Sequence, residues 1–235
     1  TMTAAEIPKT CYGNDRDLPS LFHTIGRIRN RLMFRTNSHT IIPFLLGGAK
    51  DVNRGEPCFS LQNLAQTPQQ LLVPATPLVA ELSLGNAAIP ILDDNLRQEV
   101  IAFLGSHYRG RQPAPQLEKT VAGLDQLLDQ ASPASDEAIL LRRLQQNYQQ
   151  FGYFSHIDWR LDHWGCAGDI DGVVAETFTV PTPAIEFFTL ATPPILALQL
   201  LANTFPSVHF TLQYGVEGDG PVHEVRFHPF PPFGY

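Results

Sequence analysis

Tyr148-Gln-Gln-Phe-Gly-Tyr-Phe-Ser-His-Ile-Asp-Trp-Arg-Leu-Asp-His-Trp-Gly-Cys166 is the stretch of this sequence that says most about its fold. It holds both tryptophans of the chain, together with two tyrosines, two histidines and two aspartates. Residues 156–164 predict a short helix, and Gly165 supplies the left-handed residue that commonly ends one.

The segments around this stretch predict helices before it and mainly strands after it. Ser135 followed by two acidic residues is a typical helix start, because the helix dipole favours negative charge there. Val208, Phe210, Leu212 and Tyr214 alternate as on one face of a half-buried strand. The predicted helices are 117–130, 135–150 and 193–205, and the predicted strands are 173–180, 185–190, 208–214 and 222–227.

The N-terminal half is less regular. Residues 20–34 predict an amphipathic helix, because an apolar stripe recurs there at helical spacing. Residues 37–90 predict short strands and loops, among them 40–46 and 79–84, and a second helix opens at Asp93 and Asp94. Two prolines in residues 112–116 would break any helix there, so this segment is the best candidate for a boundary between the two parts of the chain. The apolar stripe of residues 20–34 consists of Leu21, Ile25, Ile28 and Leu32.

This order of elements predicts an α+β fold. We expect a ferredoxin-like antiparallel sheet with covering helices in a C-terminal domain, residues 117–235, and a smaller irregular α+β region in residues 1–112. The strand at 208–214 could form an edge that pairs with a second copy, so the oligomeric state stays open.

Composition and charge narrow the class of protein. The chain has 235 residues and three widely spaced cysteines, which favours reduced thiols in a cytoplasmic protein. We expect no secretory signal and no membrane span, because no apolar run is long enough. The net charge is −7, and residues 151–235 hold two basic against nine acidic side chains. Such an acidic part would repel nucleic acid and could meet a basic protein surface.

Several segments resemble a known family. Tyr153–Trp159 with Trp164-Gly165 is similar to its tryptophan-rich core, and Phe188–Pro194 to its strand-to-helix junction. Phe205-Pro206, followed by Phe210 and Tyr214, resembles its helix-to-strand exit, and Phe59–Pro68 an upstream segment. Together these resemble the YubB-like, ferredoxin-fold family of phages, plasmids and integrative elements, a domain of unknown function.

The resemblance implies the ferredoxin-like fold and an origin in a mobile genetic element, and it implies no catalytic residues. The sequence departs from the family pattern at Cys166-Ala-Gly168, where the family has a lysine and a second tryptophan. It departs again at Leu190-Ala191, where another family tryptophan is absent. A family binding site that uses those residues would be incomplete here.

The aromatic residues of the opening stretch admit two interpretations. Tyr153, Trp159 and Trp164 could form a platform on which a base or sugar stacks. A tryptophan-rich helix beside a sheet is more often part of the core, and only Arg160 supplies a basic neighbour.

The same stretch holds a candidate metal set. His156 and His163 lie on one helical face, and Asp158 and Asp162 are on the same short helix. Divalent metals take such ligands, although zinc sites usually have tighter spacing and a second cluster elsewhere. Cys166 follows a helix C-terminus, where the dipole works against a thiolate nucleophile.

The sequence contains one ridge of basic residues, although the net charge of the chain is negative. Arg27, Arg31 and Arg35 recur every four residues, with Arg29 beside them, opposite the apolar stripe. They could grip phosphates, although a solvated helix face has the same pattern.

No nucleotide-binding, hydrolase or metalloprotease motif is present, and none for a cofactor. The sequence therefore favours a non-enzymatic accessory protein of a mobile element that binds a host protein, for example in counter-defence through an acidic face. Two alternatives stay open. One is a nucleic-acid-binding module that uses the Arg27–Arg35 ridge, and the other is a small metal-dependent hydrolase.

Overall fold

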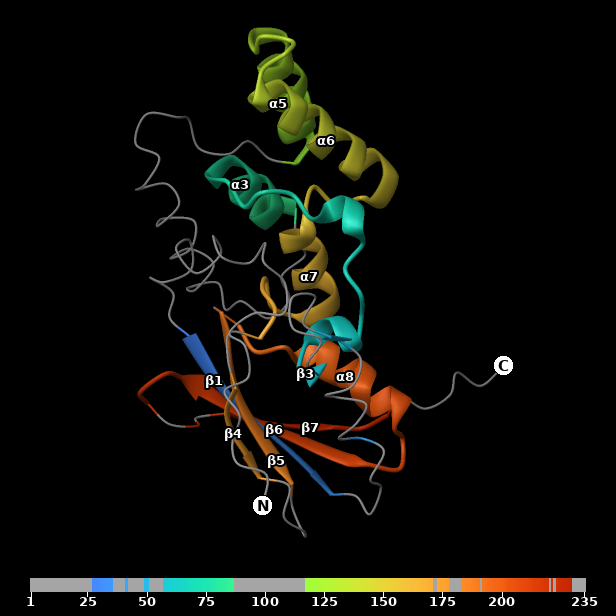
Figure 1. Cartoon of the computed structure of the whole chain (residues 1–235), viewed down its shortest axis with the longest axis vertical. Coiled ribbons are helices and arrows are strands. Elements are labelled where there is room, and N and C mark those ends of the chain that lie inside the picture. The colour runs from blue at the N-terminus through green and yellow to red at the C-terminus, as the bar shows by residue number, and fades with distance from the viewer. Residues whose placement is uncertain are drawn as a thin grey trace, which may run out of the picture.

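The fold is built on a five-stranded antiparallel sheet with helices on one side (Figure 1). The computed structural model describes residues 27–35, 41, 49–50, 57–86, 117–170, 173–177, 183–190, 192–219, 221 and 223–229. The strand order is β4-β5-β1-β6-β7. The strands are β1 (Arg27–Arg35), β4 (Val173–Thr177), β5 (Ala184–Leu190), β6 (His209–Val216) and β7 (His223–Phe227).

The remaining described elements are mostly helical. All of them except α8 lie between β1 and β4 in the sequence. A small two-stranded sheet pairs β2 with β3. The bounds are β2 (Ala49–Lys50), β3 (Pro57–Cys58), η2 (Leu61–Asn63), η3 (Gln69–Leu71), α3 (Pro77–Asn86), α5 (Leu117–Gln130), α6 (Asp136–Phe151), α7 (His156–Trp164) and, between β5 and β6, α8 (Ile195–Thr204).

The topology is ferredoxin-like, as the sequence predicts. Strands β6, β1, β5 and β4 lie side by side in that order, and all neighbours are antiparallel. The helical segment that ends in α7 connects β1 to β4, and α8 connects β5 to β6. Strand β7 extends the sheet beside β6.

The prediction of a helix over residues 20–34 is wrong for residues 27–34, which belong to strand β1; residues 20–26 lie outside the described part. In β1, Ile28, Asn30, Leu32 and Phe34 are buried, and the side chains between them are partly or fully exposed. This alternation has the period of two that a strand requires. Strand β1 lies between β5 and β6, so the N-terminal region supplies the middle strand of the sheet.

Helix α7 joins two hydrophobic cores. Trp159 and Trp164 belong to the core between the sheet and α8, whereas Ile157 and Leu161 belong to the core with α3, α5 and α6. Figure 1 shows α7 between these two layers. A helix that is buried on nearly every side can hold both layers in place, which explains why this segment carries so many large apolar side chains.

Local capping explains the ends of α7. The Ser155 side chain accepts a hydrogen bond from the backbone of Ile157, and the Asp158 carboxylate accepts one from the backbone of Ser155. Gly165 ends the helix at φ 85°. These three residues form a capping box and a left-handed stop, so the helix has its predicted bounds, residues 156–164.

The other predictions have mixed outcomes. Helices at 117–130, 135–150 and 193–205 and strands at 185–190, 208–214 and 222–227 are confirmed within a few residues, and the strand at 173–180 is described as far as Thr177. The strand at 79–84 is wrong, because Thr76 and Pro77 start helix α3 there. Strand β6 is flanked on both sides, so it is no sheet edge. The helix opening at 93–94, the boundary at 112–116 and, except for residue 41, the strand at 40–46 lie outside the described residues.

Within the ranges that the structure describes, no helix combines the length and the apolar character that crossing a membrane requires.

Two glycines provide a matched test of the assigned helix ends. Gly152 ends α6 at φ 76°, whereas Gly123 lies inside α5, and a Cβ at either position meets nothing within 4 Å. Gly152→Ala is expected to lower the free energy of unfolding by about 1–2 kcal/mol, since a left-handed conformation strains any residue with a Cβ. Gly123→Ala should raise it by about 0.5–1 kcal/mol. Urea denaturation of both variants measures the two changes; equal signs would contradict the assigned helix ends.

Candidate nucleic-acid interface

The candidate site is the face of the sheet opposite α7 and α8, which we call the open face. The side chains at alternate positions of β1 point toward it, because their neighbours fill the helix-covered core. Arg29, Arg31 and Arg35 are exposed there, and Arg27 is half-buried. The arginine ridge predicted from the sequence therefore exists, on a strand instead of a helix.

Glu186 of β5 holds two of these arginines side by side. Its carboxylate accepts a hydrogen bond from Arg29 Nη2 at 2.5 Å and lies 3.6 Å from Arg31 Nε. The pairing follows from the register, in which Arg31 is opposite Glu186 and Arg29 is opposite Phe188. Both arginine side chains keep 51% of their surface exposed, so their remaining N–H groups stay accessible to a ligand.

The β6–β7 side of the open face is polar as well. Gln213 donates a hydrogen bond to Glu224 at 3.1 Å, and Arg226 donates another at 3.1 Å. These donors lower the pKa of Glu224, Gln213 first and Arg226 second. Glu224 is therefore ionised at neutral pH and is engaged by its own neighbours.

A single ring, that of Phe188, accompanies the charges among the described Phe, Tyr and Trp side chains of this face. Phe188 is partly buried, and the Arg27 guanidinium carbon lies 3.9 Å from the centre of its ring. Arg27 Nη1 is also 3.5 Å from a carboxylate oxygen of Glu217, in the turn after β6. The guanidinium thus contacts both an aromatic ring and a carboxylate.

The charge balance of the open face is opposite to that of the chain. Among the described side chains, five of the 16 basic residues lie on this face, against the three glutamates that pair with arginines of the sheet, in a chain of net charge −7. The basic residues are Arg27, Arg29, Arg31, Arg35 and Arg226, and the acidic residues are Glu186, Glu217 and Glu224. Such a face attracts polyanions.

The predicted aromatic platform lies mostly in the core. Trp164 is fully buried and Trp159 is 8% exposed, which matches the core interpretation of both residues. Tyr153 is partly exposed and packs its ring edge-on against His163, 5.7 Å away between centres. Burial, and next the neighbouring Asp162 carboxylate, raise the pKa of Tyr153. None of these three residues lies on the open face.

The four residues of the predicted metal set have separate structural roles. His156 is fully buried with Nδ1 3.3 Å from the Leu71 carbonyl, and His163 stacks on Trp159. Asp158 caps its own helix; burial raises its pKa, against the opposing effect of its hydrogen bonds. Asp162 lies beside Tyr153. In the described part of the chain, no three His, Cys, Asp or Glu side chains are grouped to hold a metal ion.

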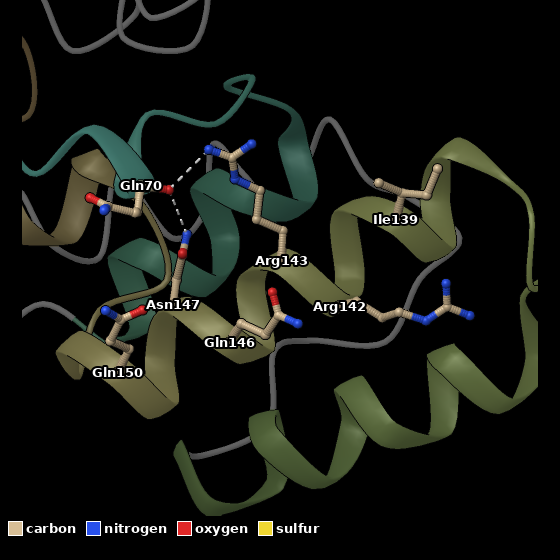
Figure 2. Close-up of a pocket in the computed structure, with 7 residues that line it drawn as sticks. All are labelled: Gln70, Ile139, Arg142, Arg143, Gln146, Asn147 and Gln150. Carbon is tan, nitrogen blue, oxygen red and sulfur yellow. Dashed lines mark hydrogen bonds between the residues drawn. The ribbon is translucent and has the colours of Figure 1, made fainter.

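A second basic region is a hollow on helix α6 (Figure 2). It is less suited to a ligand, because its two arginines already donate to backbone carbonyls. Its volume is about 450 Å³. Arg143 and Asn147 both donate to the backbone carbonyl of Gln70, and Arg142 donates to that of Pro133. These bonds tie η3 and the α5–α6 turn to α6. The hollow is lined by Gln70, Ile139, Arg142, Arg143, Gln146, Asn147 and Gln150.

Part of the open face is not predicted from the sequence, namely Glu186, Phe188, Gln213 and Arg226. The alternation along strands β5, β6 and β7 contained a signal for them. Without the pairing register, however, the sequence could not place them beside the arginines of β1.

Comparison with known proteins adds one structural likeness. No family model and no curated protein matches the sequence. The crystal structure of a protein api92 from Yersinia pseudotuberculosis, with the family model DUF1281, is similar over 88% of this chain and 99% of that chain. The sequence identity is 14% and the TM-score is 0.34.

Proposed function

We propose that the protein binds a strand of nucleic acid on the open face of its sheet. The observation that carries this proposal is the row of four arginines on the central strand, at Arg27, Arg29, Arg31 and Arg35. Guanidinium groups recognise phosphates through paired N–H donors, and phosphate contacts supply most of the affinity of sequence-independent binding.

The spacing of the arginines suits an extended strand. Side chains two residues apart on one face of a β-strand are separated by about 6.4–6.8 Å. This is comparable with the distance between successive phosphates in a stretched single strand. Arg29 and Arg31 follow one another at this spacing and are both exposed, so they can contact successive phosphates.

The structure gives less support to the hypothesis that an acidic face binds a host protein. Three glutamates of the acidic C-terminal third, Glu186, Glu217 and Glu224, are paired with arginines of the sheet. The acidity that motivated the hypothesis is thus partly neutralised at this surface. Binding of a nucleic-acid strand would also suit a protein of phages and plasmids, the setting that the family resemblance implies.

Removal of one negative charge from the open face provides a test in which the affinity for nucleic acid is expected to increase. Glu186→Gln is expected to increase the affinity for a strand of about 12 nucleotides by about 3- to 10-fold, because it releases Arg29 and Arg31 from their ion pairs and removes a charge that repels phosphate. Fluorescence anisotropy with labelled single strands, at several salt concentrations, measures the change.

Asp129→Asn is the control. Asp129 is exposed and belongs to α5, a helix that lies away from the sheet (Figure 1). This substitution changes the net charge by the same amount. Little change in affinity is expected for it. Equal gains for both variants would indicate an effect of net charge alone and would contradict a site on the open face.

A further inference from the structure

We propose that two copies of this chain associate through the outer edge of strand β7, so that their two sheets continue as one. The partner is a second copy because this edge is complementary to itself. In the part of the chain that the structure describes, β7 pairs with β6 on one side and no strand lies on its other side. The inference goes beyond the proposed function and does not depend on it.

The register shows which backbone groups of β7 point outward. Glu217, directly after β6, donates a backbone hydrogen bond to β1 at 2.9 Å, so the odd-numbered residues of β6 face β1 and the even-numbered ones face β7. Leu212 is opposite Val225, and these two residues therefore exchange backbone hydrogen bonds. The backbone groups of Glu224 and Arg226, on either side of Val225, point away from β6 toward the edge.

The side chains along this edge are exposed and oppositely charged. Arg226 has 74% of its side chain exposed and Glu224 has 40%, and both lie on the open face. Val225, between them, packs against the core on the other face. Charged side chains usually keep an exposed edge from pairing with another chain. In β7, however, their order allows pairing in one register.

Antiparallel pairing of two β7 strands about Val225 brings opposite charges together. Glu224 of one copy is then opposite Arg226 of the second copy, and symmetry repeats this contact on the other side of the axis. The outward-pointing backbone groups of the two residues meet and exchange both hydrogen bonds. Opposite charges directly across two strands stabilise the pair, whereas like charges destabilise it. A shift by two residues would place equal charges opposite each other, so the charges select the register centred on Val225.

Two prolines limit the length of this contact. Pro221 and Pro229 flank the strand, and a proline has no N–H to donate, so the pairing is confined to the segment between them. The two-fold axis of such a pair is perpendicular to the sheet, and the two open faces therefore lie on the same side. The two β1 strands are then separated by five strand spacings, about 24 Å. Association thus places both arginine rows on one surface.

Sedimentation equilibrium of the full chain, without nucleic acid, tests this inference. The average mass of the wild type is expected to rise with concentration from the 26.1 kDa of one chain toward twice that mass. Glu224→Arg and Arg226→Glu each place like charges opposite each other in both contacts, so each should weaken the association about 10- to 100-fold. An equimolar mixture of the two variants restores opposite charges in both contacts and should associate about as tightly as the wild type.

The mixture also serves as the folding control, because only folded variants with an intact β7 can regain the association. A wild type that stays at 26.1 kDa at every concentration would overturn the inference. Association that neither substitution weakens, or that the mixture fails to restore, would overturn it as well. The proposed function is tested separately: a protein that associates in this way but binds no nucleic acid would keep the inference and contradict the proposed function, and a monomer that binds a strand would do the reverse.

Discussion

The double variant Arg29→Ala/Arg31→Ala is expected to bind a single strand about 10- to 100-fold more weakly than the wild type, because two charge-assisted contacts to phosphate disappear. Each arginine keeps 51% of its side chain exposed while it contacts Glu186, so both can reach a phosphate without leaving the surface. Their loss also leaves the Glu186 carboxylate uncompensated on the open face, which adds to the repulsion of the strand.

The dependence on salt gives a second measure of the same variant. Release of counterions makes the logarithm of the binding constant fall with the logarithm of salt by about 0.7 for each phosphate contacted on a single strand. Removal of two contacts should therefore reduce this slope by about 1.4. Anisotropy titrations at a series of salt concentrations provide both numbers.

Arg142→Ala/Arg143→Ala is the matched control. It removes two exposed arginines and the same charge from α6, where they line the hollow of Figure 2. The control should bind nearly as well as the wild type. A loss equal to that of the Arg29/Arg31 pair would show that net charge, and not the open face, determines the affinity.

Trp164→Ala is expected to have the largest effect on stability, a loss of about 3–5 kcal/mol of unfolding free energy. The indole is fully buried in the core between the sheet and α8. It donates a hydrogen bond to the Ala65 carbonyl at 2.9 Å, contacts Trp159 edge-on and lies 4.7 Å from the Arg160 guanidinium carbon. Truncation opens a cavity and leaves a partly buried carbonyl without this donor.

Trp164→Phe separates packing from the hydrogen bond. It keeps most of the apolar volume and loses the N–H, so its cost should be smaller than that of the alanine variant. Urea denaturation monitored by circular dichroism measures both variants. A loss below about 1 kcal/mol for Trp164→Ala would mean that the indole is not the packing element that the two-core arrangement requires.

The segment around α7 could be predicted because its signals are local. Ser155, Asp158 and Gly165 lie within a few residues of the helix ends that they fix, so the sequence alone defines the helix. The same holds for α5 and α6, whose bounds agree with the prediction. Hydrophobic periodicity and capping act over one or two turns and need no knowledge of the tertiary structure.

The sequence of strand β1 predicts a helix because two periods coincide at a spacing of four residues. Positions four apart share a face both on a helix, after about one turn, and on a strand, where every even spacing does. Ile28 and Leu32 fit both patterns, and so do Arg27, Arg31 and Arg35. Arg29 and Asn30 lie between these positions and distinguish the two patterns. Arg29 is exposed and Asn30 is buried, as the alternation of a strand requires.

The composition of the candidate site depends on the pairing register, which is a long-range property. Arg29 and Phe188 are 159 positions apart in the sequence and directly opposite each other in the sheet. The burial of Asn30 depends on a similar contact, since its Nδ2 donates to Thr189 Oγ1 at 2.9 Å. No local pattern contains these partners, so the sequence could indicate the arginine ridge but not the ring and carboxylates around it.

The measurement that tests the central claim most directly is a ¹H–¹⁵N NMR titration of the intact protein with a single strand, read at the arginine Nε–H signals and the backbone amides. The signals of Arg27, Arg29 and Arg31 are expected to move, together with the amides of β1, β5 and β6. Those of Arg142 and Arg143 on α6 should not change. Unchanged open-face signals, or shifts confined to the α6 hollow, would contradict the claim that the sheet binds the strand.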